Sequence, residues 1–395
     1  MSGQPLERAV RAFRTAFGRP PSLGVRAPGR VDVIGAHVDY NGGFVLPAAI
    51  DRYVWLAIGP SSDGRSSLVA TDFDQRVTLP AGALDSHTDA GGRALPSWAL
   101  YPAGTAWALQ SAGLETVPMC AAIAGDVAIG AGLSSSAALE VAFATAWKAL
   151  GGWAAGDLEL ATLCKKAENE YVGVACGIMD QMASALGRRG HALLIDCRSL
   201  ACEPVPLPVG TTLVVADTTT RRQLADGALN RRHEECRQAL DLLCEHVGPR
   251  AALGEVTAEE LSEHASALPE PLRSRARHVV GECGRVLAVA EAMRRGEPER
   301  VGELMNESMR SSRDLYAISG PELDALWSAG TEHDGCLGGR LVGAGFAGCV
   351  VFLVRTAAVA DFADRTRRRF EAATGTKPSV FVAEPSGGAH VVALD

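Results

Sequence analysis

Apolar residues along the chain come in short runs separated by turns. Runs of this length, rich in Val, Ile, Leu and Ala, are typical of buried strands. Strands are predicted at residues 53–60, 66–73, 119–127 and 191–198, and beyond residue 200 at 211–220, 348–355 and 379–385.

Helical spacing of apolar residues marks several segments between these strands. Near the N-terminus, Leu6, Val10, Phe13 and Phe17 share one face, which predicts an amphipathic surface helix. The segment at 135–150 is Ala-rich and apolar on nearly all sides, so it predicts a buried helix. Further helices are predicted at residues 96–111, 157–173 and 357–375, with long charged helices over 231–304.

The order of these elements predicts an α+β chain of two lobes. The pattern changes near residues 200–210, where strands and Ala-rich helices give way to long charged helices. We therefore expect an N-terminal lobe at 1–205 and a C-terminal lobe at 206–395. The active site is expected between the lobes, where ligand sites are common.

Composition narrows the class of protein further. The chain has 395 residues, 47% hydrophobic and 21% charged, with a formal net charge of −8, which argues against nucleic acid as the main partner. No run approaches the ~18–20 apolar residues of a membrane span, and the charged N-terminus lacks a secretion signal. Ten cysteines without CxxC pairs predict reduced thiols in a cytoplasmic protein. No obligate protein partner is evident from the sequence.

One fifteen-residue stretch, at residues 29–43, has the composition of a binding site for a small polar ligand. GRVDVIGAHVDYNGG contains one arginine, two aspartates, a histidine, a tyrosine and four glycines. Arg30 and Asp39 are close in sequence, whereas Ala36 occupies a slot where a polar residue is expected. The stretch therefore predicts a polar pocket with an unusual apolar position.

A second stretch joins a glycine-rich turn to the predicted buried helix. Gly130 and Gly132 precede Ser134, Ser135 and Ser136. The N-terminus of a helix presents unpaired N–H groups and a partial positive charge, so this arrangement suits a phosphate. Neither the P-loop pattern GxxxxGK[ST] nor a strand-linked GxGxxG with its downstream acid is present. A capped helix after a flexible turn explains the same residues without a ligand.

Two acids stand out further along the chain. Asp180 directly follows an apolar stretch, where a carboxylate requires a partner, and Glu168 lies twelve residues earlier. One acid is suited to orient a hydroxyl and the other to hold a divalent cation, since Mg²⁺ takes one or two protein carboxylates plus phosphates. The structural alternative is a helix cap at Asp180 and an ion pair of Glu168 with Lys165.

A second glycine-rich loop precedes a predicted strand near the C-terminus. It contains Gly343, Gly345 and Gly348. Glycines at such a place allow close approach to a ligand or to another backbone. A tight, densely packed hairpin turn is the alternative to a ligand contact.

Taken together and in order, these stretches resemble the galactokinase branch of the GHMP small-molecule kinases. The resemblance spans residues 26–392. It is carried by APGRVDVIGAHVDYNGGFVLPAAI, GAGLSSSAALEVA, CGIMDQMASALGRRGHALLIDCRSL, LMNESMRSSRDLYAISGPELDALW and GGRLVGAGFAGC.

The resemblance implies a two-lobed fold that transfers the γ-phosphoryl of ATP, with Mg²⁺, to the anomeric hydroxyl of a galactose-like sugar. It implies that Asp180 is the catalytic aspartate and Arg30 its companion, and that Glu168 and a loop serine, chosen as Ser135, hold the magnesium. The remaining implied contacts are Gly130, Gly132, Leu133, Ser134, Ser135 and Ser136 for the triphosphate, Trp98 near the adenine, and His37, Asp39 and Gly177 for the sugar.

The chain departs from the family pattern at several positions. Asp32 replaces a usual Asn, and Ala36 replaces a Glu that contacts the sugar's C6 hydroxyl. Either Ala228 or Leu229 replaces a sugar-contacting Tyr. Two further positions, Ala344 and Ala347, stand where galactokinases usually have Gly.

These departures leave the sugar open. Galactose is the expected substrate, and galacturonate or another sugar altered at C6 is the alternative, because loss of the Glu removes a charge that would repel a carboxylate. Arg221 or Arg222 is the candidate cation for such a carboxylate. A non-catalytic galactose sensor is a third reading, disfavoured because Arg30, Asp180 and the phosphate loop are all retained.

Overall fold

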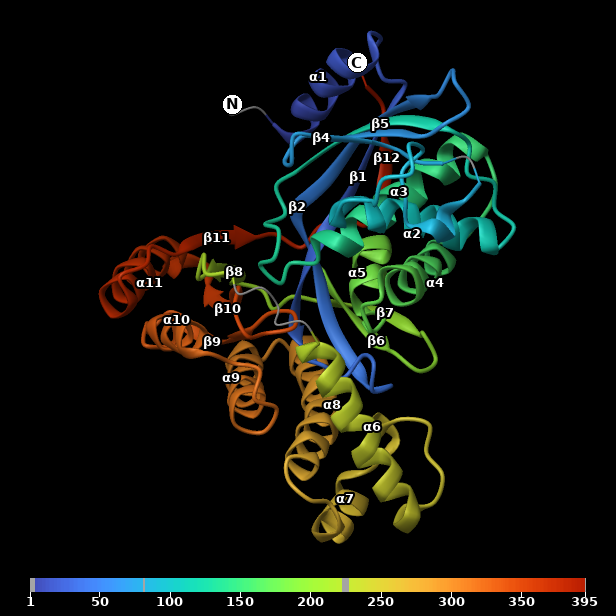
Figure 1. Ribbon diagram of the computed structural model, residues 1–395. Helices are drawn as coiled ribbons and strands as arrows, with labels where there is room; N and C mark the ends of the chain where they lie inside the picture. The colour runs from blue at the N-terminus through green and yellow to red at the C-terminus, as the bar shows by residue number, and fades with distance from the viewer. Residues whose placement is uncertain (1–3, 81, 222–226, 395) are drawn as a thin grey trace.

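The computed structural model describes residues 4–80, 82–221 and 227–394, and within them two β-sheets organise the chain. The larger sheet has the strand order β12-β1-β2-β5-β3-β4; β6 also pairs with β2, and β7 pairs with β6. The smaller sheet has the order β11-β8-β10-β9. Figure 1 shows the two sheets in separate bodies that meet along β1 and β2. The expected α+β fold is confirmed.

The strands have the following bounds. In the larger sheet they are β1 (Leu23–Ile34), β2 (Phe44–Pro60), β3 (Ser67–Ala70), β4 (Gln75–Thr78), β5 (Met119–Gly125), β6 (His191–Asp196), β7 (Cys202–Pro206) and β12 (His390–Val392). In the smaller sheet they are β8 (Thr211–Asp217), β9 (Cys336–Leu341), β10 (Cys349–Arg355) and β11 (Ser379–Ala383).

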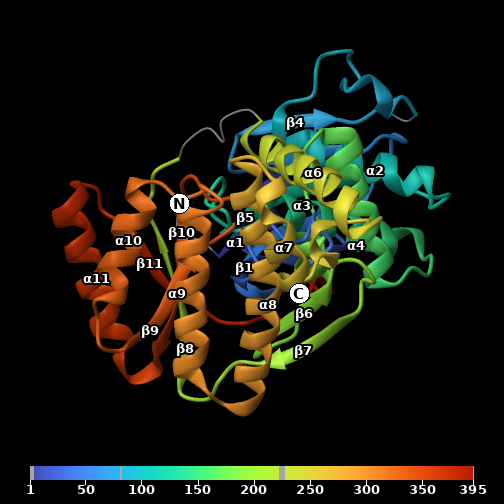
Figure 2. The ribbon, with the colours of Figure 1, turned by 90° about the horizontal axis from the view of Figure 1, so that it is seen from below.

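Helices pack on both faces of the larger sheet, and others pack against the smaller sheet. Those of the first half are α1 (Pro5–Phe17), α2 (Ser97–Ser111), α3 (Ser135–Gly151), α4 (Asp157–Lys166) and α5 (Met179–Leu186). Those of the second half are α6 (Ala228–Val247), α7 (Ala258–His264), α8 (Leu272–Arg295), α9 (Pro298–Asp314), α10 (Pro321–Thr331) and α11 (Val359–Thr374). Figure 2 shows α8 and α9 side by side between the two bodies, and α8 also packs on β2.

Local sequence explains most of these elements. The helix α1 buries Phe13 against β2 and β5, as its apolar stripe predicts. The helix α3 is buried on most sides, with Trp147 and Phe143 in the core, as its composition predicts. The helix predicted at 157–173 ends at Gly173 as expected, but its second half, Ala167–Val172, is a π-helix. Such π-turns often occur at functional sites, and this one contains Glu168.

Five of the described strands, β1, β4, β7, β9 and β12, were not predicted from the sequence, and two of them bear on the site. The strand β1 contains Arg30 and Asp32, and its pairing with β2 shifts register between Pro28 and Arg30 and again between Asp32 and Ile34. The strand β12 returns from the end of the chain to pair with β1 in the larger sheet. β12 belongs to the predicted C-terminal lobe but pairs within the larger sheet of the first half. The division into lobes at 205/206 stays a prediction.

Candidate active site

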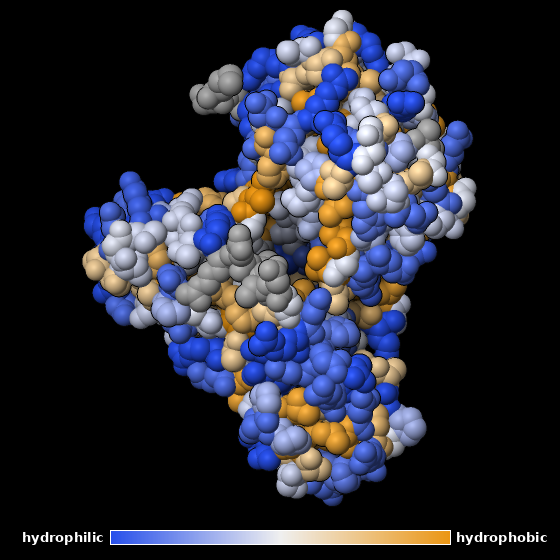
Figure 3. Space-filling view, viewed as in Figure 1, coloured by the Kyte–Doolittle hydropathy of each residue, from blue (hydrophilic) through white to orange (hydrophobic). Residues whose placement is uncertain are grey.

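A cleft of about 500 Å³ opens between the two bodies. Figure 3 shows it as a hollow near the centre of the molecule, bordered by apolar surface. Of the predicted site residues, its walls contain Arg30, Trp98, Gly130, Gly132, Leu133, Ser134, Ser135, Ser136, Glu168 and Asp180. The second glycine-rich loop, at 343–347, forms another part of the wall.

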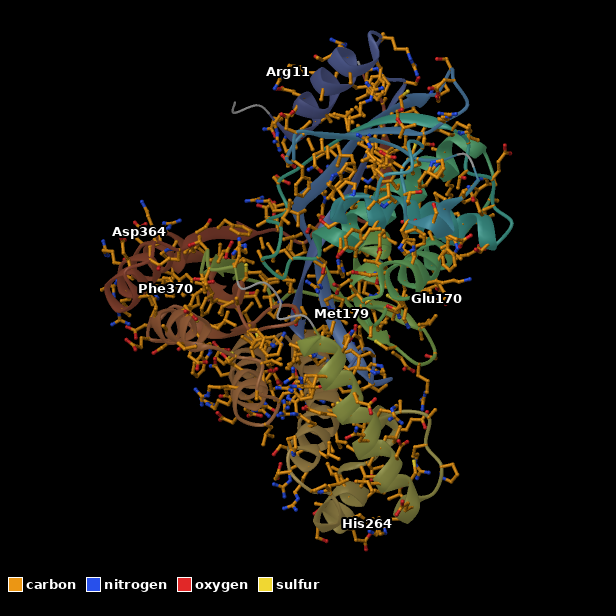
Figure 4. The ribbon with its side chains drawn as sticks, viewed as in Figure 1. Arg11, Glu170, Met179, His264, Asp364 and Phe370 are labelled. Carbon is orange, nitrogen blue, oxygen red and sulfur yellow. The ribbon has the colours of Figure 1, made fainter. Side chains whose placement is uncertain are left out.

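Arg30 and Asp180 form the central ion pair of this cleft. Nε and Nη2 of Arg30 donate to the two carboxylate oxygens of Asp180, each at 2.7 Å. The Ser134 hydroxyl donates to the same carboxylate. Arg30 is 4% exposed and Asp180 25% exposed, so the carboxylate keeps a free side toward the cleft. Figure 4 labels the neighbouring Met179, where α5 begins beside β2.

Nearby carboxylates keep the Arg30 guanidinium charged. Burial opposes the positive charge of Arg30, but Asp180, Asp32 and Asp39 outweigh it and raise the pKa of the guanidinium. Burial and the nearby Asp180 raise the pKa of Asp39 to about 6. The site is therefore a fixed cation among several carboxylates.

The predicted phosphate loop, residues 130–136, is held in place by Arg30. Its Nη1 donates to the Gly132 carbonyl at 2.6 Å, and its backbone N–H donates to the Leu133 carbonyl at 3.1 Å. Ser134 has a left-handed backbone with φ of 57°, and its side chain does not cap α3. The capped-helix alternative therefore fails for Ser134, whose hydroxyl is directed to Asp180. Ser135 begins α3, so the unpaired N–H groups of the helix N-terminus face the cleft.

The second glycine-rich loop packs backbone to backbone on the phosphate loop. A Cβ added at Gly132 would lie 2.7 Å from the Val342 carbonyl oxygen, and one at Gly348 would lie 2.6 Å from that of Ala131. Gly343 has a positive φ and equally close contact with Gly132. The dense-packing reading of these glycines is therefore correct, and the same loop also lines the cleft.

Glu168 lies buried at one side of the cleft. Gln181 Nε2 donates to Glu168 Oε2 at 2.6 Å, and the Ser136 hydroxyl is a second partner. Burial and the charge of Asp180 raise the pKa of Glu168 to about 7. The ion pair considered between Glu168 and Lys165 is absent from the described ion pairs. Within the described residues no group of three or more His, Cys, Asp or Glu side chains is arranged to hold a metal.

The far end of the cleft is aromatic. Trp98 and Phe73 lie parallel, with ring centroids 6.4 Å apart and 9° between their planes. Gln75 fixes Trp98 by accepting a hydrogen bond from its indole Nε1 at 2.7 Å. Phe73 is 44% exposed, which is unusual for an aromatic residue in a folded protein. Sequence analysis missed two residues that line the cleft: Phe73, in the turn after β3, and Tyr101, in α2. The sequence gives no ligand signal at either place.

The predicted sugar residues lie beside the cleft. Ala36, His37, Asp39 and Gly177 are outside the set of described residues that line it. Asp39 lies against Gly177, where any Cβ would overlap its carboxylate. His37 uses both ring nitrogens, with Tyr40 Oη at 2.7 Å and the Ala344 carbonyl at 3.0 Å.

The charge state of His37 and the position of Leu229 bear on this sugar region. Burial lowers the pKa of His37 to about 3, so its ring is neutral. Of the two candidates for the missing tyrosine, Leu229 lines the cleft and Ala228 does not. Arg221 is paired bidentately with Asp217, and Arg222 lies outside the described residues.

The fold and this cleft define a small-molecule kinase of the GHMP class. A family model for the GHMP kinases N terminal domain matches residues 101–188, and one for the GHMP kinases C terminal region matches 289–372. The crystal structure of the Methanococcus jannaschii mevalonate kinase has the same fold, with a TM-score of 0.62 at 17% identity over 93% of this chain and all of that one.

More specific matches follow. The galactokinase galactose-binding signature matches residues 11–60. A galactokinase of Roseiflexus sp. (strain RS-1) is 42% identical over 95% of this chain and 94% of its own, and one of Chloroflexus aggregans is 40% identical over 89% and 88%. The Lactococcus lactis galactokinase, crystallised with galactose, superimposes with a TM-score of 0.92 at 31% identity over 98% of both chains. The chain therefore belongs to the galactokinase family of the GHMP kinases.

The family predicted from the five motifs is thereby confirmed, as are the kinase class and the fold. The roles of individual site residues stay predictions. In the part of the chain that the structure describes, no helix combines the length and apolarity needed to cross a membrane.

Proposed function

We propose that this chain is an ATP-dependent sugar 1-kinase that transfers the γ-phosphoryl of ATP to the anomeric hydroxyl of D-galactose, giving galactose 1-phosphate. The observation that carries this proposal is the Arg30–Asp180 pair at the mouth of the phosphate loop. The Asp180 carboxylate can receive the attacking hydroxyl. It is bonded to Ser134, directly before the N-terminus of α3, which is suited to phosphate. Membership of the galactokinase family supports the choice of sugar.

In this proposal Asp180 receives the sugar. Its exposed side accepts a hydrogen bond from the anomeric hydroxyl and either orients it or takes its proton. Arg30 holds the carboxylate in place through two hydrogen bonds and balances the negative charge that develops on the sugar oxygen. Asp39 is close enough to Asp180 for the charge of Asp180 to raise its pKa. It is the proposed partner of the ring hydroxyls, with His37 and Gly177 beside it.

The nucleotide occupies the remaining walls. Backbone N–H groups of the loop from Gly130 to Ser136 cradle the phosphates, including the amides near Leu133 and Ser134. The parallel rings of Trp98 and Phe73 provide apolar surface for the adenine. Phosphoryl transfer depends mainly on such positioning and charge neutralisation.

Magnesium fits the residues present. Glu168 offers a buried carboxylate oriented by Gln181, and the hydroxyls of Ser135 and Ser136 lie on the same wall. One carboxylate is sufficient because Mg²⁺ keeps waters and binds nucleotide phosphates. When bound, the ion neutralises the phosphate oxygens. Glu168 and Ser135 are the proposed ligands, with Ser136 as the hydroxyl that contacts Glu168.

Galacturonate remains the second candidate because of Ala36 and Leu229. An apolar Leu229 in the wall and a short Ala36 remove two polar groups of the family pattern from the sugar region. However, the described candidate cation, Arg221, is engaged by Asp217 at 2.6 and 2.7 Å. Galactose is therefore the substrate that the site supports better.

A sugar screen tests the proposal. ADP release is measured with galactose, galacturonate, galactosamine, 2-deoxygalactose, arabinose and glucose at saturating ATP and Mg²⁺. Galactose is expected to give the highest kcat/KM. A higher kcat/KM for galacturonate would replace galactose as the substrate, and the absence of sugar-dependent ADP release would favour a sensor.

A further inference from the structure

A chain of buried hydrogen bonds starts and ends on the same short segment of the sugar signature. At its start, Arg340 Nη1 donates to the Asp32 carboxylate at 2.6 Å and to the Asp32 carbonyl at 2.8 Å. Arg340 Nε donates to the Ser308 hydroxyl at 3.1 Å, and this hydroxyl donates to Glu282 Oε1 at 2.5 Å. Glu282 Oε1 then accepts the backbone N–H groups of Gly35 at 3.1 Å and Ala36 at 3.3 Å.

We call these four side chains, Asp32, Arg340, Ser308 and Glu282, the clasp. They come from β1, β9, α9 and α8, so three elements of the second half of the chain hold one segment of the first half. All four are fully buried. None of them lines the cleft among the residues that the structure describes, and the mechanism above does not use them.

The clasp is electrically balanced. Arg285 Nε donates to the second oxygen of Glu282 at 2.8 Å, so two arginines face two carboxylates. Burial opposes the charge of Glu282, but Arg285, His278 and Arg340 outweigh it and lower its pKa to about 2. A buried carboxylate must be satisfied in this way, because leaving it unpaired is strongly unfavourable.

The segment that the clasp holds has an unusual backbone. Gly35 has φ of 107° and His37 has φ of 58°, two conformations that L-residues rarely adopt. His278 Nε2 donates to the Ala36 carbonyl at 3.1 Å, so α8 fixes both polar groups of that peptide position. This turn leads directly into Asp39, whose carboxylate lies against Gly177.

We propose that Glu282 is a positioning residue for the sugar site. Its carboxylate holds the turn at Gly35 and Ala36, and the turn places Asp39 relative to Asp180; this rests on the sugar site proposed above. Ser308 and Arg340 orient Glu282 and connect the turn to the second glycine-rich loop, where Gly343 N–H donates to Asp32 at 2.9 Å. Among the described hydrogen bonds, none joins Glu282 itself to the loop at 130–136 or to Trp98, so sugar use is expected to depend on Glu282 and ATP use to change little.

The test substitutes Glu282→Gln, which keeps the shape and replaces one acceptor oxygen with a donor. Expected results are a rise of about tenfold or more in the KM for galactose and a change of less than about twofold in the KM for ATP. Hydrogen exchange should quicken about tenfold or more in peptides covering 32–40 and stay unchanged in peptides covering 135–150. The exchange result does not depend on which sugar is the substrate.

Two further variants keep the test decisive. Ser308→Ala removes only the bridging hydroxyl and should shift the galactose KM and the exchange at 32–40 in the same direction by about threefold, and it decides the matter if Glu282→Gln does not fold. Glu291→Gln lies on the same helix but pairs with Arg295 at the surface, so it should change neither. Equal changes in both KM values, or faster exchange in both segments, would show a merely structural role and overturn the proposal. Unchanged exchange at 32–40 would also overturn it. If wild-type enzyme shows no galactose turnover, the proposed function fails while the exchange data still test the clasp.

Discussion

One strand contributes to two arginine–aspartate pairs that have the same chemistry but different surroundings. In β1, Arg30 pairs with Asp180, and two residues later Asp32 pairs with Arg340. The shortest oxygen–nitrogen distance is 2.6 Å in both pairs. The first lies at the cleft, with Asp180 25% exposed, whereas both members of the second are fully buried.

The difference shows that surroundings, not residue type, decide what an ion pair does. Asp180 has a free side toward the cleft and a serine hydroxyl from the phosphate loop. Both oxygens of Asp32 are occupied, one by Arg340 and the other by the Gly343 N–H. The first pair is therefore suited to act on a substrate, and the second to hold two parts of the chain together.

The largest expected effect separates the two pairs directly. Asp180→Ala should lower kcat by about 10²–10⁴ while leaving the fold and nucleotide binding largely intact, because the group that orients or deprotonates the sugar hydroxyl is lost. Steady-state kinetics and nucleotide titration measure both properties. Retention of more than about a tenth of the wild-type kcat would contradict the role of Asp180.

The next effect concerns the proposed magnesium site beside the Arg30–Asp180 pair. Glu168→Ala and Ser135→Ala should each raise the Mg²⁺ concentration needed for half-maximal rate by about tenfold, with a smaller change in the galactose KM. The measurement is a Mg²⁺ titration at fixed sugar and ATP. Ser136→Ala is measured alongside these two variants, because the Ser136 hydroxyl contacts Glu168. If all three variants match the wild-type requirement, these residues are structural.

The next prediction concerns the stability that the buried Asp32–Arg340 pair contributes. Asp32→Asn leaves the buried Arg340 without its counter-charge but keeps the shape, so the free energy of unfolding should fall by roughly 1.5–3 kcal/mol. The expected loss in kcat is less than about tenfold, far below that of Asp180→Ala. Urea denaturation and kinetics on the same preparation measure both. Unchanged stability together with a large loss of kcat would reverse the comparison.

Lowering the pH should also reduce stability through His278, which is buried and bonded to the turn that the clasp holds. Burial lowers the pKa of His278 to about 4, against 6.5 for an ordinary histidine, with the Glu282 charge opposing the shift. The unfolded chain therefore binds the proton more tightly, so stability falls as the pH drops below about 6.5 and this loss levels off near 4.

A histidine substitution isolates that contribution. Between pH 7 and pH 5 the wild type should lose about 2 kcal/mol more unfolding free energy than His278→Gln, because other titrating groups are common to both proteins. Urea denaturation at the two pH values gives the difference. Equal losses in the two proteins would mean that His278 is already protonated in the native state.

The smallest expected effect lies at the end of β1, in the turn that the clasp holds. Ala36→Glu should raise kcat/KM for galactose and lower it for galacturonate, because it restores an acceptor for the C6 hydroxyl and repels a carboxylate. The ratio between the two sugars is the measurement. A ratio that changes by less than about threefold, or roughly 0.7 kcal/mol, would mean that Ala36 does not face C6.

The sequence alone determined the elements with a local cause and the residues that act in contiguous motifs. The apolar pattern predicted α1, α3 and α11 because helical periodicity is a property of neighbouring residues. The glycine–serine loop at residues 130–136 was predicted as a phosphate site because its backbone groups belong to one short segment. The ordered motifs were sufficient to identify the family.

Only the tertiary structure decided which distant groups meet. Arg30 and Asp180 are 150 residues apart, and only the family resemblance, not any spacing rule, placed them together. Asp32 and Arg340 are 308 apart, and nothing in the sequence predicted their contact. The sequence likewise gave no reason to expect that Ser134 contacts Asp180 instead of capping α3, or that Phe73 lies parallel to Trp98. Such contacts depend on how sheets and helices pack in three dimensions, and periodicity along a single chain records only which face of an element is buried.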